Sequence, residues 1–134
     1  MTVNERTLNA ITKSLKYLKN VPSGIYFCFN YAGHLSLEAD TQEQVRAIRK
    51  AFRGVIWKKK FIEWNSSWQY TCKTRSGVEV TINGCKEGPP ACKMVEEIVM
   101  EKREVPSEPV TYVTKMVEVK KIRYICPDGD KVRD

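Results

Sequence analysis

The stretch Thr41–Ile62, TQEQVRAIRKAFRGVIWKKKFI, decides the fold class and carries most of the excess positive charge. Thr41 is followed three residues later by Gln44, a capping-box pattern that predicts the start of a helix. The apolar residues that follow recur at the spacing of one helix face; they are Val45, Ile48, Ala51 and Phe52. Gly54 is suited to end this helix in a left-handed conformation. Residues 55–61 then read as a strand.

From Arg46 to Lys60 this stretch contains seven basic residues and no acidic residue: Arg46, Arg49, Lys50, Arg53, Lys58, Lys59 and Lys60. The whole chain of 134 residues carries a formal net charge of +7, so this segment accounts for the entire excess. A concentrated positive charge favours an anionic partner, such as a nucleotide, a nucleic acid or an acidic protein face. The alternatives are a solvated basic surface and a favourable interaction with the helix dipole.

The elements around this stretch predict an α+β domain. An apolar stripe predicts a first helix over residues 4–21; its members are Leu8, Ile11, Leu15 and Leu18. The aromatic segment 25–31 is predicted to be a strand buried on both faces, forming a hairpin with the alternating segment 35–39. Two more strands are expected at 68–75 and 78–82. Short turns between strands indicate an antiparallel sheet with two helices packed on one face.

The composition changes at residues 85–93, CKEGPPACK. We therefore expect a core domain at 1–84, followed by a loop and an extended C-terminal β arm at 85–134. Residues 94–104 fit a helix or a strand, and we favour the strand. Residues 110–126 alternate as a long strand, with a bulge or an end near Lys120-Lys121.

The remaining parts of the tail are predicted to be a turn at residues 106–109 and a frayed end over the last eight residues. A long two-stranded ribbon is only marginally stable by itself in water. We therefore expect the arm to lie on another sheet or on a second protomer, in a homodimer or a higher homo-oligomer.

The cysteines argue against a metal site. Cys72, Cys85, Cys92 and Cys126 are separated by 13, 7 and 34 residues and contain no close pair of the kind that structural zinc sites use. A bridge between Cys85 and Cys92 around the Gly-Pro-Pro loop is geometrically possible in an oxidising setting. The polar N-terminus and the absence of a long apolar run favour a cytoplasmic protein with reduced thiols and no membrane contact.

The sequence offers little for catalysis. His34 is the single histidine, and no residue is marked out to orient it beside a thiol. Metal-dependent nuclease chemistry needs acidic residues on the core sheet. No pattern marks out such a site among the acidic residues there, which are Glu38, Asp40, Glu63 and Glu79. Neither GxxxxGK[ST] nor GxGxxG occurs, so we expect no nucleotide-hydrolysing or dinucleotide cofactor chemistry.

Aromatic residues beside the basic segment point instead to binding, because basic residues attract phosphates and aromatic faces stack bases. Trp68 and Tyr70 share a face with Cys72 and are expected to point inward. Trp64, at a turn with Asn65 and Ser66, is the expected exposed stacking residue.

The order of elements, the segment VEVTINGCKEGPPACKMVEE and the β-rich tail ending in YIC resemble small accessory proteins encoded by bacteriophages. The resemblance spans nearly the whole chain and contains no catalytic motif. It implies a phage or prophage origin and a role inside an infected bacterium. Proteins of that class often inhibit or sequester host components, including defence systems.

Together these features predict a non-catalytic binding protein that captures an anionic ligand, a nucleotide or nucleic acid, or that blocks a host protein. Its predicted ligand-binding residues are the seven basic residues of the segment together with Trp64. A nucleic-acid-binding regulator and a small enzyme are the alternatives.

Overall fold

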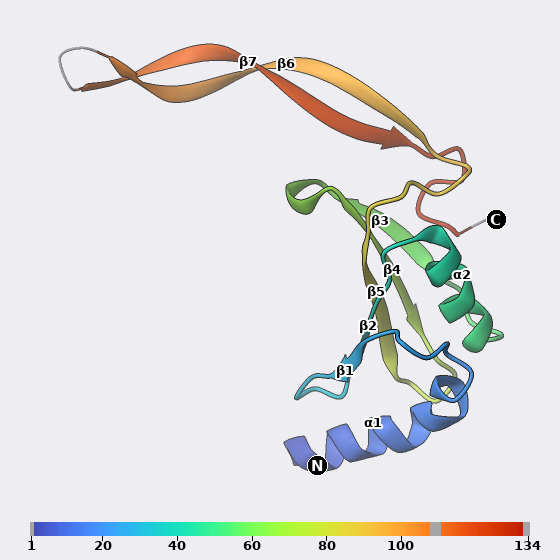
Figure 1. Cartoon of the computed structure of the whole chain (residues 1–134). Coiled ribbons are helices and arrows are strands. Elements are labelled where there is room, and N and C mark those ends of the chain that lie inside the picture. The colour runs from blue at the N-terminus through green and yellow to red at the C-terminus, as the bar shows by residue number, and fades with distance from the viewer. Residues whose placement is uncertain (1, 108–110, 133–134) are drawn as a thin grey trace.

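The computed structural model describes residues 2–107 and 111–132 and shows an α+β core from which a long β-hairpin projects (Figure 1). In chain order the elements are α1 (Val3–Leu18), β1 (Phe27–Phe29), β2 (Leu35–Glu38), α2 (Gln42–Ala51), β3 (Lys58–Ile62), the 3-10 turn η1 (Glu63–Asn65), β4 (Ser67–Lys73), β5 (Glu79–Cys85), β6 (Lys93–Ser107) and β7 (Thr111–Ile125). Of the helices in the described ranges, neither has the length and apolarity needed to cross a lipid bilayer.

The core sheet has the strand order β1-β2-β5-β4-β3 and is mixed. All neighbouring strands are antiparallel except β2 and β5, which pair in parallel, with Leu35 opposite Val80 and Leu37 opposite Ile82. The expectation of a purely antiparallel sheet is wrong at this pair. The chain crosses through α2 from β2 to the far edge of the sheet, and the β3–β4–β5 meander then builds inward. The last strand of that meander therefore runs in the direction of β2.

Helix α2 forms as its sequence predicts. The Thr41 side chain accepts a hydrogen bond from the Gln44 backbone N–H (3.2 Å), and the Gln44 side chain accepts one from the Thr41 N–H (3.3 Å). Gly54 has a φ of +78°, the left-handed conformation expected of it, although the helix already ends at Ala51. The capping box thus fixes where the chain leaves β2 and turns along the sheet.

The core lies between one face of the sheet and the two helices. Buried side chains from the sheet, from α2 and from the residue after α2 meet there: Leu35, Leu37, Val45, Ile48, Phe52, Trp68, Tyr70, Val80 and Ile82. Phe52, just after α2, stacks on Tyr17 of α1 (ring centroids 5.0 Å apart) and meets the edge of Trp57. The inward orientation predicted for Trp68 and Tyr70 is confirmed.

Two parts of the predicted core are wrong. Leu8 and Leu15 are 63% and 57% exposed, because α1 rests on the sheet through Ala10 and Ser14 instead. The aromatic segment 25–31 contributes only the short strand β1, in which Phe27 is exposed. Because β1 is the edge strand of the sheet, it has only one neighbouring strand to cover its side chains.

The second face of the sheet is polar and is not covered by the helices. It presents the alternate residues of β3, β4 and β5, all exposed or half-buried: Lys58, Lys60, Gln69, Thr71, Lys73, Glu79, Thr81 and Asn83. We call this surface the open face. Its polarity follows from the two-residue period of strands, which sends every second side chain away from the core.

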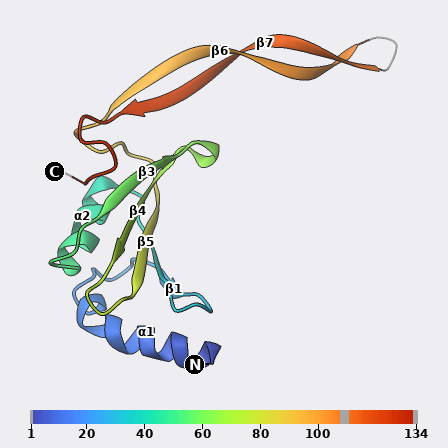
Figure 2. The same cartoon turned by 180° about the vertical axis from the view of Figure 1, so that it is seen from behind.

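Strands β6 and β7, called the arm below, form a separate two-stranded antiparallel sheet that extends away from the core (Figures 1 and 2). The preference for a strand over residues 94–104 is confirmed. Pairing is continuous from Lys93–Ile125 to Ser107–Thr111, so the prediction of a bulge or a strand end near Lys120-Lys121 is wrong. Of the predicted turn at 106–109, residues 106 and 107 belong to β6, and 108–109 lie outside the described residues.

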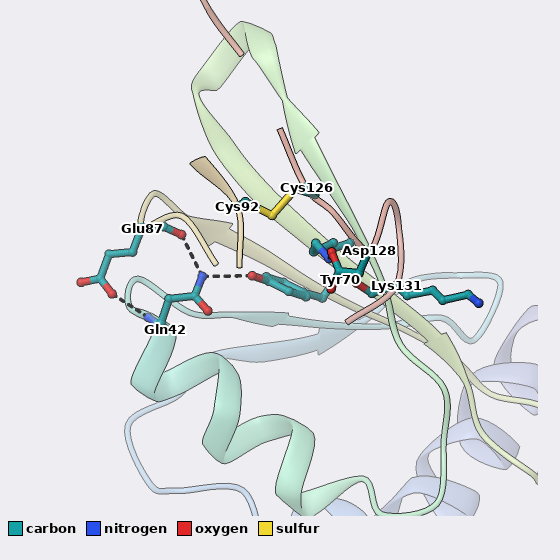
Figure 3. The surroundings of a disulfide bond; sticks show 8 residues. Gln42, Tyr70, Glu87, Cys92, Cys126, Asp128 and Lys131 are labelled. Atoms are coloured by element: carbon teal, nitrogen blue, oxygen red, sulfur yellow. Dashed lines mark hydrogen bonds and ion pairs between the residues drawn. A yellow bond between two sulfur atoms is a disulfide. The ribbon is translucent and has the colours of Figure 1, made fainter. Parts of the chain in front are cut away.

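The segment between the core and the arm is fastened to α2. The Gln42 backbone N–H donates to the Glu87 carboxylate (2.8 Å), and the Gln42 side chain donates to the Glu87 carbonyl (2.8 Å) and to the Tyr70 hydroxyl (3.0 Å) (Figure 3). A carboxylate at this position also suits the positive end of the helix dipole.

A disulfide between Cys92 and Cys126 closes the base of the arm (Figure 3). The pairing of Lys93 with Ile125 places these two cysteines opposite each other, with their Cα atoms 4.3 Å apart. The possible bridge between Cys85 and Cys92 is therefore wrong, and so is the expectation that all thiols are reduced. Cys85 is a free thiol buried in the sheet, where it donates to the Glu87 carbonyl (3.5 Å).

We expect Cys92→Ser to lower the free energy of unfolding by about 2–4 kcal/mol, because the bridge restricts the unfolded chain over a separation of 34 residues. Urea unfolding with and without a reductant measures the effect. Reductant should destabilise the native protein and leave Cys92→Ser unchanged, whereas equal unfolding midpoints in all four samples would contradict the prediction. Cys28→Ser, at an exposed free thiol, is the control.

Candidate anion-binding groove

The seven basic residues of the segment 46–60 do not form one surface. Arg46, Lys50 and Arg53 are exposed on or just after α2, on the helical side of the sheet. Lys58 and Lys60 are exposed on the opposite, open face. Arg49 is half-buried, and Lys59 is buried. The alternation along β3 thus divides the predicted patch between two sides of the molecule.

Lys59 joins the C-terminal segment to the core. Its ammonium group lies 2.6 Å from the Asp128 carboxylate and donates to the Lys131 carbonyl, and the Lys59 and Asp128 side chains are only 2% and 4% exposed. The Lys59 backbone N–H also donates to the Asp130 carbonyl (2.7 Å). Lys59 is therefore structural and out of reach of an external ligand. The C-terminal segment is attached to the core as far as Val132. The prediction that the last eight residues are frayed is therefore wrong for residues 127–132.

An open groove of about 770 Å³ lies between the arm and the turn that follows β3, and we call it the arm groove. Both views place this turn beneath the arm (Figures 1 and 2). Residues of the core and of β7 line the groove together, including Lys60, Glu63, Trp64, Lys120, Lys121 and Ile122. It is the place where the structure brings two of the predicted ligand-binding residues, Lys60 and Trp64, together.

Trp64 is 86% exposed within η1, and its predicted exposure is confirmed. Its position depends on a tight turn in which Ser66 adopts a left-handed conformation (φ 51°). The Ser67 hydroxyl donates to the Asn65 side chain (2.7 Å) across the same turn. The indole is thus held at the rim of the groove with its ring available for stacking, which stays a prediction.

The charge of the groove lining is positive, with three lysines against Glu63. Lys120 contacts Glu96 (3.0 Å) and Lys121 contacts Glu101 (2.6 Å). The hydrogen bond from Lys121 lowers the pKa of Glu101, and the same bond raises the pKa of Lys121, so both groups stay charged at neutral pH. Because exposed ion pairs contribute little free energy, a phosphate can replace the carboxylate partner of either lysine.

Two further groups of polar or titratable side chains lie outside the arm groove in the described part of the chain. His34 lies 3.2 Å from Glu79 at an exposed position on the open side of the sheet. Burial raises the pKa of the Cys72 thiol to about 12, and it also raises the pKa of Cys85. Both thiols therefore remain protonated and weakly nucleophilic at neutral pH.

Cys92, Cys126 and Asp128 lie close enough together to suggest metal ligation. The two sulfur atoms are bonded to each other, however, and Asp128 faces the Lys59 ammonium. In this oxidised form the group offers no thiolate to a metal.

Comparison with protein-family models, with curated proteins and with solved structures finds no match.

Sequence reasoning missed Lys120 and Lys121 as groove residues. They lie 60 or more positions after the basic segment, and only the return of β7 toward the core brings them beside Lys60. The available signal in the sequence was a pair of adjacent lysines in an otherwise alternating strand. Adjacent strand residues face opposite sides, so one of these lysines had to leave the alternating pattern.

Proposed function

We propose that the protein is a non-catalytic binding protein that captures a phosphate-bearing ligand, a nucleotide or a nucleic acid, in the arm groove. The observation that carries the proposal is the convergence of Lys60, Lys120 and Lys121 around the exposed Trp64. Lysine ammonium groups supply salt-dependent attraction for phosphates. An exposed indole supplies a stacking surface that accepts any base.

Fluorescence anisotropy with labelled ATP and a labelled oligothymidylate tests this function. Replacing Lys60 and Lys121 together by Gln should weaken binding of both probes by about tenfold or more, because charge-assisted contacts to phosphate are lost. The matched control, R46Q/K50Q, removes the same charge from exposed positions on α2 and should change affinity by less than about twofold. If the α2 pair weakened binding and the groove pair did not, the groove assignment would be wrong.

Trp64→Ala should weaken binding of both probes by roughly 5- to 100-fold, the range for loss of one stacked base. Trp64→Phe should keep most of the affinity, because it retains an aromatic face. Trp57 and Trp68 are buried, so quenching of indole emission on ligand addition should disappear in both variants. Unchanged quenching in Trp64→Phe would contradict a ligand beside this ring.

A second candidate function, blocking a host protein, is supported by the arm. Met94, Ile98 and Met100 are exposed along β6, and the arm presents unpaired strand edges. Such edges accept strands from another chain. They fit capture of a host component by a phage protein inside the infected bacterium, including a component of host defence. They also fit pairing of two protomers into a homodimer, which sedimentation equilibrium would detect.

A further inference from the structure

We infer that the ligand is a single-stranded nucleic acid that runs from the arm groove across the open face, rather than a mononucleotide. This inference rests on the proposed function for the arm groove and extends it to a second groove. That groove, of about 690 Å³, lies where β3, β4 and β5 meet the loop after α2. Its lining includes Ile56, Lys58, Thr71, Lys73 and Arg75. We call it the loop groove.

The two grooves are joined through β3. Lys60 lines the arm groove and Lys58 lines the loop groove. The two lysines are two residues apart on one strand, so their side chains lie on the same face, about 7 Å apart. A chain that leaves one groove therefore enters the other without crossing the sheet.

Charge along this path favours an extended polyanion. Six basic side chains line it in all: Lys121, Lys120, Lys60, Lys58, Lys73 and Arg75. The acidic residues among the two linings are Glu63 and Glu79, and Glu79 faces His34. A mononucleotide could use only one groove and would leave the three cations of the other groove without a phosphate. A polymer with one phosphate per nucleotide could engage both sets.

The uncharged residues on the path favour unpaired bases. Trp64 is 86% exposed in one groove and Ile56 is 85% exposed in the other, and both present apolar surface to the path. Between them the face carries the hydroxyl of Thr71 and the amide of Gln69. Basic grooves combined with an aromatic platform characterise binding of single strands with little sequence preference. Bases stacked within a duplex could not lie on the Trp64 ring.

The experiment compares three probes on the full chain: ATP, a twelve-nucleotide oligothymidylate and a twelve-base-pair duplex. The single strand should bind more tightly than either of the others. Contacts to six cations predict a slope of log affinity against log salt of about −4 for the single strand, measured from about 50 to about 200 mM salt.

The discriminating variant is K58Q/K73Q, which alters only the loop groove. It should weaken binding of the oligothymidylate about tenfold and make its salt slope shallower by about 1.4, while leaving ATP binding unchanged. The control R46Q/K50Q removes the same charge outside both grooves and should change neither probe. All four substituted residues are exposed, and thermal unfolding checks that both variants fold.

The outcomes separate the two proposals. If ATP and the oligothymidylate bind equally, or if K58Q/K73Q has no more effect than the control, the extended path is wrong and capture in the arm groove stands. Tighter binding of the duplex also overturns the single-strand inference. If neither ATP nor the single strand binds, both the inference and the proposed function fail.

Discussion

Lys59→Met should lower the free energy of unfolding by about 3–5 kcal/mol, because it leaves the Asp128 carboxylate buried without its ammonium partner. The substituted side chain fills a similar space, so the loss comes from the broken ion pair rather than from a cavity. Chemical denaturation followed by far-ultraviolet circular dichroism measures the effect. The neighbouring Lys58→Met, at an exposed position, should stay within about 0.5 kcal/mol of the native protein.

The double variant K59M/D128L distinguishes a buried charge from a general packing defect. Replacing both members of a buried ion pair by apolar groups is often neutral, so the double variant should recover most of the stability lost in Lys59→Met. If the stability lost in K59M/D128L equalled the sum of the losses in Lys59→Met and Asp128→Leu, the coupling between Lys59 and Asp128 would be absent. Equal stability of Lys59→Met and Lys58→Met would likewise contradict the structural role of Lys59.

Phe52→Ala should destabilise the protein by about 3–5 kcal/mol, the usual range for removing a buried aromatic ring. Phe52 is 1% exposed and contacts Tyr17 and Trp57, so it joins α1 to the segment that leads into β3. Thermal unfolding measures the loss, and the emission of Trp57 should change because its neighbour is gone. Phe52→Leu should cost much less, since it fills most of the space.

The matched control for this prediction is Ile56→Ala, which removes apolar side-chain atoms from a position four residues away that is 85% exposed. It should leave unfolding nearly unchanged. If Ile56→Ala destabilised the protein as much as Phe52→Ala, the ring contacts of Phe52 would not be the source of the effect.

Local signals in the sequence predicted the local structure well. The Thr41–Gln44 capping box and the apolar stripe placed α2 correctly, because both act over a few residues. The strand preference for residues 94–104 was also correct, although the apolar residues there occur in adjacent pairs that fit a helix face as well as a strand. The parallel pairing of β2 with β5 was out of reach, because it depends on the path that the whole chain takes around α2.

The candidate site shows why composition alone misplaced the charge. Three consecutive lysines on a strand cannot face the same side, so either Lys59 or both of its neighbours had to turn toward the core. Lys59 is the residue that turns inward, because its partner Asp128 lies 69 residues later in the chain. The alignment of the arm strands, which also joins Cys92 to Cys126, brings Asp128 to this position. The exposure of Trp64 could be predicted because the polar turn that causes it lies within a few residues of Trp64 in the sequence.

The arm also determines how the molecule behaves in solution. Two strands of 15 residues at about 3.4 Å per residue give a projection of about 50 Å, longer than a compact core of this size is wide. Such a shape raises friction with the solvent without adding mass. A single copy should therefore elute early from a sizing column, as a compact protein of larger mass would. Light scattering, which measures mass independently of shape, will separate an extended monomer from a true pair.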